Sequence, residues 1–369
     1  MNGGGKKPVN ICINRDANFV LGADEQSTDQ MQLTLDDAII FPGLINAHDH
    51  LDFNLFPALG SKTYNNYTEW GKHIHETYKS EIDAVLKVPI ELREEWGVYK
   101  NLLCGVTTVV NHGAQIKINE PLITVFEDNQ SLHSVAFEEK WKAKLNNPLR
   151  IRETVTIHTG EGTDGRARTE IDELIRWNIW RRPIVAVHGV AMTEEKAKQF
   201  KAVIWCPDSN YFLLNKTARV DLLKHRTKIL FGTDSTLTGG WNIWNHIRLA
   251  RKTKMLTDQE LFDSLTSNPA LIWTDIANKT DAVVAKRNGK ETYLQSFFNT
   301  DPADILLIIK QGRVILFDEV LLPQLHDTGL EEFSVITING TTKHVKGDLP
   351  ALAEKIRAYY PEAVFPFTN

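Results

Sequence analysis

Residues 38–52 read AIIFPGLINAHDHLD, and this stretch decides how the rest of the chain is interpreted. A β-prone apolar run leads into His48 and His50, which stand one residue apart with Asp49 between them. On a β-strand, residues i and i+2 point to the same face. Both imidazoles can therefore reach one metal ion, whereas Asp49 should point to the opposite face.

A second pair with the same spacing, His73 and His75, lies in a different local pattern. Trp70, Ile74 and Tyr78 recur at every fourth position, which is typical of a helix. On a helix, residues i and i+2 are about 200° apart, so this pair cannot chelate one ion together. We expect surface or lid residues here, although one of the two can still reach a pocket singly. Trp70 can either contact a substrate or pack in the core.

The middle of the chain alternates apolar strand-like runs with helical patterns. Runs such as TVTIHT, PIVAVHG and KILFGTD are interleaved with segments such as RTEIDELIRW and TARVDLLKHR. Strands that are apolar on both faces and separated by helices indicate a parallel sheet covered by helices. An open doubly wound sheet and a closed (β/α)₈ barrel both fit this pattern. Thr169 is the expected N-cap of one helix, and Thr257 with Glu260 has capping-box spacing.

Both ends of the chain show the pattern of β-structure. Short β-prone runs occupy residues 10–14, 18–22 and 31–41, and others occupy residues 303–309 and 312–320. Asn339-Gly340 lies between two further runs and is a strong hairpin signal. A short helix is expected near the C-terminus, over residues 350–360. We place boundaries near Phe41 and Thr300, so that residues 1–41 and 301–369 form one small β-domain and residues 42–300 form the α/β domain.

One stretch of the middle region is compressed. Only about 45 residues separate His112 from His158, whereas two strand-helix units need about 60. SLHSVAF, residues 131–137, can supply one strand. The other strand must be short, or its helix must be missing.

Composition and charge exclude several classes of function. The net charge of −5 and the pI of about 6.2 provide no basic face for nucleic acid. No apolar run approaches the roughly 18 residues of a membrane span, and no apolar core follows the N-terminal lysines as a signal peptide requires. The cysteines, Cys12, Cys104 and Cys206, are few and odd in number, which favours a reducing compartment. We expect a cytoplasmic protein whose partner is a small-molecule substrate, with no nucleic-acid or membrane partner. Homo-oligomerisation stays open.

Each strand-like run of the middle region ends in a residue that can bind a metal or move a proton. In a barrel, the C-terminal ends of the strands face one common opening, so residues far apart in the sequence meet there. Imidazoles with a carboxylate form a mixed site suited to zinc or another divalent transition metal. The candidate residues are His48, His50, His158, Glu161, His188 and Asp234.

Each candidate also has a simpler explanation when it is taken alone. His188 can be an ordinary core histidine, Asp234 can cap the loop that follows it, and His112 can be a helix-entry residue. The ordered set favours a metal site, because these residue types recur at the ends of successive apolar strands.

These residues, in this order, resemble the amidohydrolase superfamily of metal-dependent hydrolases, and best its branch of cytosine and guanine deaminases and triazine hydrolases. FPGLINAHDHL resembles the first strand of that family, CGVTTVVN its second, and IHTGEG carries its His-x-x-Glu. VHG, WCPDSN and FGTDS resemble its sixth, seventh and eighth strands, so the resemblance runs from about Ala38 to Ala303. It implies an α/β fold, namely a (β/α)₈ TIM-type barrel with a small β-sandwich domain formed by both chain termini.

The resemblance also implies roles for the candidate residues. One divalent metal ion, with zinc as the first choice and iron as the alternative, would be bound by His48, His50, His158 and Asp234. Glu161 would shuttle a proton, His188 would orient the water or polarise the substrate, and Asp234 would also accept the water proton. Ser209-Asn210 matches a motif of the family without an assigned role.

The number of metal ions follows from a missing residue. The two-metal branches of the family place a lysine at the fourth strand. Lys140, Lys142 and Lys144 lie instead in a charged, helix-like stretch, EEKWKAKLNN, and none is a convincing match. One metal is therefore expected.

The expected function is a hydrolase acting on carbon–nitrogen bonds other than peptide bonds. A metal-bound hydroxide would attack an sp² carbon and release ammonia or an amine from a small, heterocyclic substrate. The alternative is a non-catalytic relative of the barrel that binds a small ligand or a partner. A third hypothesis treats His48-Asp49 as the metal-binding pair of an all-helical phosphohydrolase, but Pro42 and Gly43 disfavour a helix there.

Overall fold

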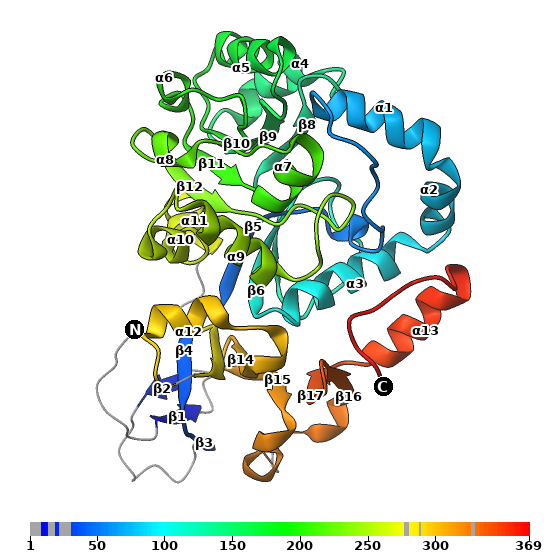
Figure 1. The fold of residues 1–369 in the computed structure, drawn as a ribbon, viewed down its shortest axis with the longest axis vertical. Helices are drawn as coiled ribbons and strands as arrows, with labels where there is room; N and C mark the ends of the chain where they lie inside the picture. Colours follow the sequence, from blue (N-terminus) through cyan, green and yellow to red (C-terminus); the bar gives the residue numbers. More distant parts are fainter. Residues whose placement is uncertain (1–8, 14–18, 22–30, 277–279, 288, 326–328) are drawn as a thin grey trace.

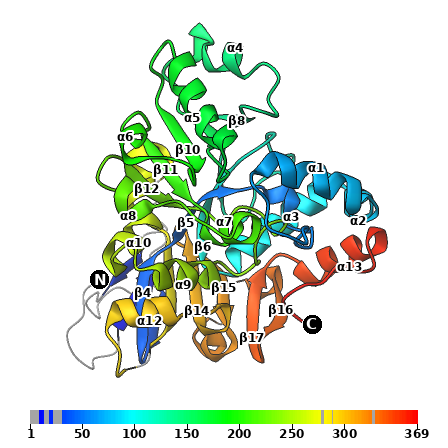
Figure 2. The same ribbon diagram turned by 45° about the horizontal axis from the view of Figure 1, so that its top comes forward.

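The centre of the structure, a computed structural model, is built from two ladders of parallel strands (Figures 1 and 2). The structure describes residues 9–13, 19–21, 31–276, 280–287, 289–325 and 329–369. One ladder has the order β5-β6-β7 and the other the order β12-β11-β10-β9-β8. The bounds are β5 Leu44–Asp49, β6 Val106–Asn111, β7 Thr124–Phe126, β8 Gln130–Ser134, β9 Val155–Thr159, β10 Ile184–His188, β11 Ala202–Trp205 and β12 Lys228–Phe231.

Strands β5, β6, β9 and β10 are buried on both faces, as the apolar runs predict for a parallel sheet. The predicted α/β class is therefore confirmed. Strands β5 and β12 begin and end the series, and the backbone joins their C-terminal ends. The amides of Thr233 and Asp234 donate to the carbonyl of His48 at 3.2 and 3.1 Å. The first and last strands of the series thus deliver their polar residues to one place.

The compressed stretch contains fewer helices than two full strand-helix units would, and one of its strands is very short. Strand β7 has only three residues, and no helix lies between β6 and β7 or between β7 and β8, a region that the structure describes throughout. Three residues, 127–129, connect β7 to β8, and a crossover between neighbouring parallel strands needs a dozen or more. The expectation of a short strand is confirmed. Strand β7 pairs with β6 and strand β8 pairs with β9, so the two strands follow one another in the chain but belong to different ladders.

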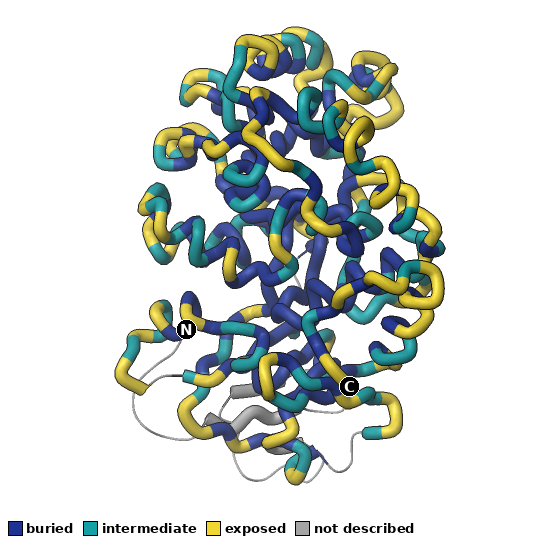
Figure 3. Tube along the Cα trace, turned by 45° about the vertical axis from the view of Figure 1, so that its right-hand side comes forward, coloured by how far each residue is buried: buried dark blue, intermediate teal, exposed yellow. Residues whose placement is uncertain are grey.

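Helices cover the outside of the strands, and the burial pattern follows this layering (Figure 3). The amphipathic α5 begins at Gly165 and is capped by Asp164, so the predicted cap Thr169 is wrong; its hydroxyl donates to the carbonyl of Gly165 inside the helix. The capping box of Thr257 and Glu260 is confirmed. None of the helices in the described ranges combines the length and apolarity of a membrane span. The helices are α1 Tyr67–Thr77, α2 Lys79–Leu86, α3 Ile90–Leu102, α4 Trp141–Leu145, α5 Gly165–Trp177, α6 Glu194–Ala197, α7 Pro207–Leu214, α8 Val220–Leu223, α9 Ile243–Thr253, α10 Asp258–Ser264, α11 Ser267–Ile272, α12 Tyr293–Asn299 and α13 Leu349–Tyr359.

A six-stranded antiparallel sheet unites the two ends of the chain. Its order is β16-β17-β15-β14-β13-β4, so β4 from the N-terminal region pairs with β13. The predicted hairpin is confirmed, because Asn339 and Gly340 connect β16 to β17 with φ of 48° and 78°. Strand β13 comes from within residues 42–300, so the C-terminal contribution to this sheet begins before the boundary placed near Thr300. The bounds are β4 Ala38–Pro42, β13 Ala282–Lys286, β14 Ile305–Lys310, β15 Arg313–Asp318, β16 Phe333–Ile338 and β17 Thr341–Lys346.

A second, smaller sheet lies against the six-stranded one. It has the order β2-β1-β3, with bounds Phe19–Leu21, Val9–Ile13 and Met31–Leu35. Leu33 and Leu35 of β3 pack in one buried cluster with Val284, Leu307 and Ile309 of the larger sheet. This apolar contact holds the N-terminal β-strands beside the six-stranded sheet, on one side of the parallel strands (Figure 1).

Candidate functional site

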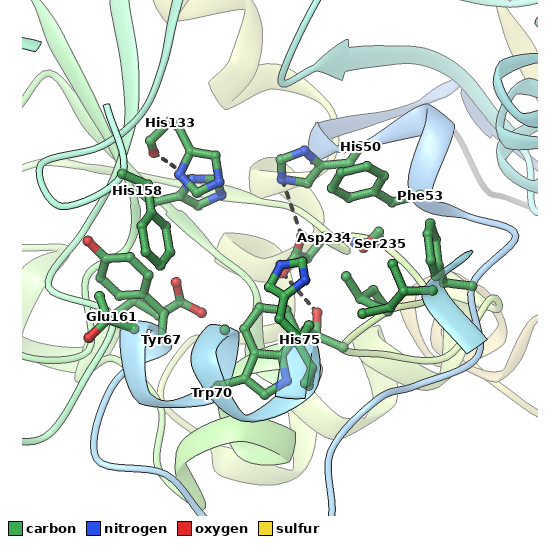
Figure 4. A pocket seen from close by; sticks show the side chains of 18 of the residues that line it. His50, Phe53, Tyr67, Trp70, His75, His133, His158, Glu161, Asp234 and Ser235 are labelled. Atoms are coloured by element: carbon green, nitrogen blue, oxygen red, sulfur yellow. Dashed lines mark hydrogen bonds and ion pairs between the residues drawn. The ribbon is translucent and has the colours of Figure 1, made fainter. Parts of the chain in front are cut away.

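Three histidines converge at the C-terminal ends of β5 and β9. One ring nitrogen from each of His48, His50 and His158 lies within 4.8 Å of the other two. The Nε2 atoms of His48 and His158 are 3.1 Å apart, and Asp234 Oδ1 lies 3.7 Å from His48 Nε2 and 3.6 Å from His50 Nε2. Figure 4 shows His50, His158 and Asp234 around the same part of a cavity. The i, i+2 pair of the opening motif therefore shares one face.

Asp49, between the two histidines, points the other way. Its carboxylate accepts from Lys100 Nζ at 3.0 Å and from the side-chain amides of Asn101 and Asn54 at 2.7 and 2.9 Å. This ion pair is fully buried, with both side chains at most 2% exposed. The sequence-based placement of Asp49 on the opposite face is confirmed, and Lys100 is a partner that the sequence did not indicate.

Asp234 is held rigidly in the loop that follows β12. Its backbone has φ of 58°, in the left-handed region that is uncommon for non-glycine residues. Ser209 and Thr238 donate their hydroxyls to Oδ2 at 2.8 and 2.9 Å, and the amide of Ser235 donates to Oδ1 at 2.9 Å. Burial alone would raise the pKa of Asp234, but His50, His188 and the two hydroxyls together lower it below its ordinary value. The carboxylate is therefore ionised at neutral pH.

The tautomer of His158 leaves a lone pair directed at the other histidines. Its Nδ1 lies 2.7 Å from the carbonyl oxygen of His133, which can only accept, so Nδ1 carries the proton. Nε2 then presents its lone pair to His48 and His50. Burial, followed by the neighbouring imidazoles, holds the pKa of both His158 and His48 well below the ordinary value. Neutral rings with free lone pairs are what metal binding needs.

His188 has the opposite tautomer, because a chain of hydrogen bonds fixes its proton on Nε2. The indole of Trp205 is a donor only, and it donates to Thr217 Oγ1 at 2.6 Å. Thr217 therefore donates its own proton to Asn210 Oδ1 at 3.2 Å, which turns the Asn210 amide nitrogen toward His188 Nδ1 at 2.9 Å. Nδ1 accepts, so Nε2 carries the proton.

The position of His188 suits a donor rather than a metal ligand. Its Nε2 lies 3.6 Å from Glu161 Oε2, and its backbone, like that of Asp234, is left-handed with φ of 69°. Burial is the main cause that lowers the pKa of His188 to about 4, with His50 adding to the effect and Asp234 opposing it. The ring is neutral at neutral pH and offers an N–H to whatever stands beside Glu161.

Glu161 is buried beside His188 and keeps its proton more readily than an exposed glutamate. Burial raises its pKa well above the ordinary value, and the negative charges of Asp234 and Glu170 add to the effect. Its backbone carbonyl accepts from the amide of Tyr67, the first residue of α1. The loop that carries Glu161 is thereby attached to α1.

A cavity of about 510 Å³ opens over these residues. His75 lines it, whereas His73 turns to Ser61 at 3.3 Å, so the helical pair is divided as expected and only one member reaches the pocket. Trp70 lines the cavity, packs against the hydrophobic core and donates its indole proton to the carbonyl of Leu59 at 2.7 Å (Figure 4). The apolar wall is formed by Phe53, Phe56, Trp70, Ile74, Ile82, Leu86, Phe137 and Leu237.

Sequence reasoning missed three contributors to the site. His133, at the end of β8, lines the cavity and orients His158 through its carbonyl. Ser209 and Asn210, which had no assigned role, hold Asp234 and His188 respectively. The only signals in the sequence were the histidine in SLHSVAF and the matched Ser-Asn motif. Among the lysines considered for a second metal, Lys142 stacks over the ring of Trp177 and Lys144 pairs with Glu138.

Comparisons with known proteins address the fold. No protein-family model matches this sequence, and no curated protein matches it. Among solved structures, atrazine chlorohydrolase from Arthrobacter aurescens complexed with zinc has a TM-score of 0.64 at 15% identity, over 95% of each chain. Guanine deaminase from E. coli has a TM-score of 0.56 at 15% identity, over 76% of this chain and 84% of that one. Aminofutalosine deaminase from Helicobacter pylori has a TM-score of 0.52 at 14% identity, over 76% and 87%. At this level of identity the likeness establishes a shared fold, and it agrees with the resemblance read from the sequence.

Proposed function

We propose that this protein is a metal-dependent hydrolase of the amidohydrolase superfamily that releases ammonia or an amine from an sp² carbon of a small heterocyclic substrate. The observation that carries the proposal is the pair of opposite tautomers. His158 presents a lone pair where His48, His50 and Asp234 converge, and His188 presents an N–H beside Glu161. Metal ligation and proton donation are thus assigned to different imidazoles.

The residues present fit one divalent ion. Two ligand atoms on a tetrahedral zinc ion lie about 3.3 Å apart, given bonds of about 2.05 Å. The separations of 3.1 Å between His48 and His158 and of 3.6–3.7 Å from Asp234 are close to that value. Three imidazoles and a carboxylate suit zinc, with iron as the alternative. The solved relative complexed with zinc is in keeping with this choice.

The side chains of this chain divide the work of replacing nitrogen by oxygen. A divalent ion bound here would lower the pKa of a coordinated water from its value in bulk water to about 7. Asp234, ionised and aligned by Ser209 and Thr238, accepts a proton from the attacking water. Glu161 delivers a proton to the departing nitrogen as the C–N bond breaks and the new C–O bond remains. His188 donates its Nε2–H to the charge that develops on the substrate.

The cavity supports a small, flat and largely apolar substrate. Its wall is mostly aromatic and aliphatic, and the imidazoles and carboxylates that line it include His158, Glu161 and Asp234 (Figure 4). A pocket of this kind fixes orientation through a few polar groups and supplies affinity through apolar contact. A heterocycle that carries its leaving amine on one edge would place that edge beside Glu161 and Asp234.

We also infer the finer architecture and the setting of the enzyme. The hydrogen bonds from Thr233 and Asp234 to His48 support closure of the two ladders into a barrel, and the packing of Leu33 and Leu35 supports a β-sandwich of the terminal sheets. Two cysteines in the described ranges, Cys104 and Cys206, are free and buried, which suits a reducing cytoplasm.

The test is a screen of amidine-like heterocycles, amides and halogenated heterocycles with zinc-loaded and iron-loaded protein. Turnover should require the metal, and Asp234→Asn should remove it, with a loss of about 10³-fold or more. Asp318→Asn is a matched control, because Asp318 is equally buried but pairs with Lys343 in the terminal sheet. Absence of turnover on every class by metal-replete protein, or full activity of Asp234→Asn, would favour a non-catalytic binding protein.

A further inference from the structure

His112 is a buried imidazole to which none of the roles described above is assigned. It follows β6 directly, and its backbone amide donates to the carbonyl of Asp49 at 2.8 Å, which extends the pairing of β5 with β6. Its side chain is only 2% exposed. The strand pairing therefore brings it to the same level as His48 and His50.

The ring of His112 is packed against the three proposed ligands. Its centroid lies 5.0 Å from the ring of His48, 5.2 Å from that of His50 and 4.5 Å from that of His158. Within the part of the chain that the structure describes, neither of its ring nitrogens has a hydrogen-bond partner. A buried polar atom without a partner destabilises a fold, so such atoms are normally satisfied by protein, water or an ion.

The neighbouring side chains offer His112 little to bond to. The proton of His158 Nδ1 is already donated to the carbonyl of His133, so His158 offers only the lone pair of Nε2, which lies 3.1 Å from His48 Nε2. A cation shared by these lone pairs satisfies them together. His112 is not a member of the group of three whose ligand atoms all lie within 4.8 Å of one another, so its ring must turn to join them.

We propose that His112 is a fourth imidazole ligand of the metal ion, an inference that rests on the metal site proposed above. Four imidazoles and the carboxylate of Asp234 would give the ion five protein ligands. Five ligands exceed the four that are usual for zinc, so such a site would favour a metal that accepts more ligands, such as iron. His112 would therefore bias the site toward iron.

Cobalt-loaded full-length protein provides the test, because Co²⁺ shifts the ring N–H proton of each bound imidazole far outside the normal NMR range. Compared with the wild type, His112→Gln should lose one shifted resonance and bind Co²⁺ about 10- to 100-fold more weakly. His344→Gln is the control, since His344 is a buried imidazole of the terminal sheet that stacks on Phe317; it should keep every resonance. His112→Phe, which retains ring volume, should repeat the loss if His112→Gln folds poorly.

The outcomes separate this inference from the proposed function. If the wild type binds Co²⁺ and His112→Gln shows the same shifted resonances with unchanged affinity, the fourth ligand is overturned and the three-histidine site stands. If the wild type binds no Co²⁺, both proposals are overturned. A purely structural role of His112 would lower the melting temperature of the variants without removing a resonance.

Discussion

The direction of the hydrogen-bond chain behind His188 can be reversed by a single substitution, Asn210→Asp. A carboxylate at this position cannot donate to Nδ1, so it should accept a proton from it. Thr217 can still donate to the other carboxylate oxygen, which keeps the side chain in place. His188 would then carry its proton on Nδ1 and present a bare lone pair at Nε2, toward Glu161.

The magnitude follows from the loss of one donor at the reacting centre. Removing a single preorganised donor from such a site costs about 10²–10³-fold in kcat, or roughly 2.7–4 kcal/mol. Asn215→Asp is the matched control. It makes the same change at the end of the same helix, at an exposed position whose left-handed backbone accepts either residue.

Two measurements check this prediction at pH 8, above the ordinary histidine pKa of about 6.5. The ring ¹⁵N shifts of His188 should show a protonated Nε2 in the wild type and a protonated Nδ1 in Asn210→Asp, and kcat should fall in the variant alone. An unchanged tautomer would refute the donor direction deduced from Trp205. A reversed tautomer with undiminished kcat would remove His188 from the chemistry.

Three further predictions concern the metal, the attachment of α1 and the dependence of stability on pH. Free zinc at about 100 times its Kd should add about 2.7 kcal/mol to the free energy of unfolding, so a chelator should lower the melting temperature by several degrees; an unchanged melting curve would contradict the site. Gly162→Ala would place a Cβ 2.7 Å from Asn66 Cβ and 2.9 Å from Asn65 O. This clash should separate α1 from the Glu161 loop and lower kcat by up to about 100-fold. In the control Gly165→Ala, the new Cβ has nothing within 4 Å, so kcat should stay unchanged. Burial raises the pKa of Glu170 despite the hydrogen bond from Tyr67, so the folded protein holds this proton more tightly than the unfolded chain does. The free energy of unfolding of the wild type, relative to that of Glu170→Gln, should therefore fall as pH rises above about 4.5. Parallel free energies of unfolding for the two proteins across pH 4.5–7.5 would contradict this prediction.

Local patterns were sufficient to predict the strands and to place the rings of His48 and His50 on one face. The spacing of His48 and His50 gains its meaning from strand geometry alone, and the same spacing at His73 and His75 loses it on a helix. The hairpin at Asn339-Gly340 is likewise a local matter of backbone conformation. These predictions needed only neighbours in the sequence.

Tertiary contacts decided what the local patterns could not. Thr169 looked like a helix cap, but Asp164 caps α5 five positions earlier, and its carboxylate is held at 2.6 Å by Asn66, 98 positions away. The tautomer of His188 depends on Trp205, whose motif WCPDSN does not reveal its hydrogen bond, and on Thr217, which lies outside the quoted motifs. Hydrogen-bond direction and long-range capping arise only when the strands and helices have assembled.

The pairing of β4 with β13 has a consequence for how the chain is made. Pro42 lies opposite Ala282 in the antiparallel ladder, 240 positions later in the sequence. At 5–20 residues per second, a ribosome needs about 12–48 s to deliver the partner strand after β4 has emerged. During synthesis β4 is an unpaired edge on the growing chain, and it lies immediately before the strand that carries His48. The sheet beside the strand that carries His48 is therefore completed late, only after the chain has been made as far as Ala282.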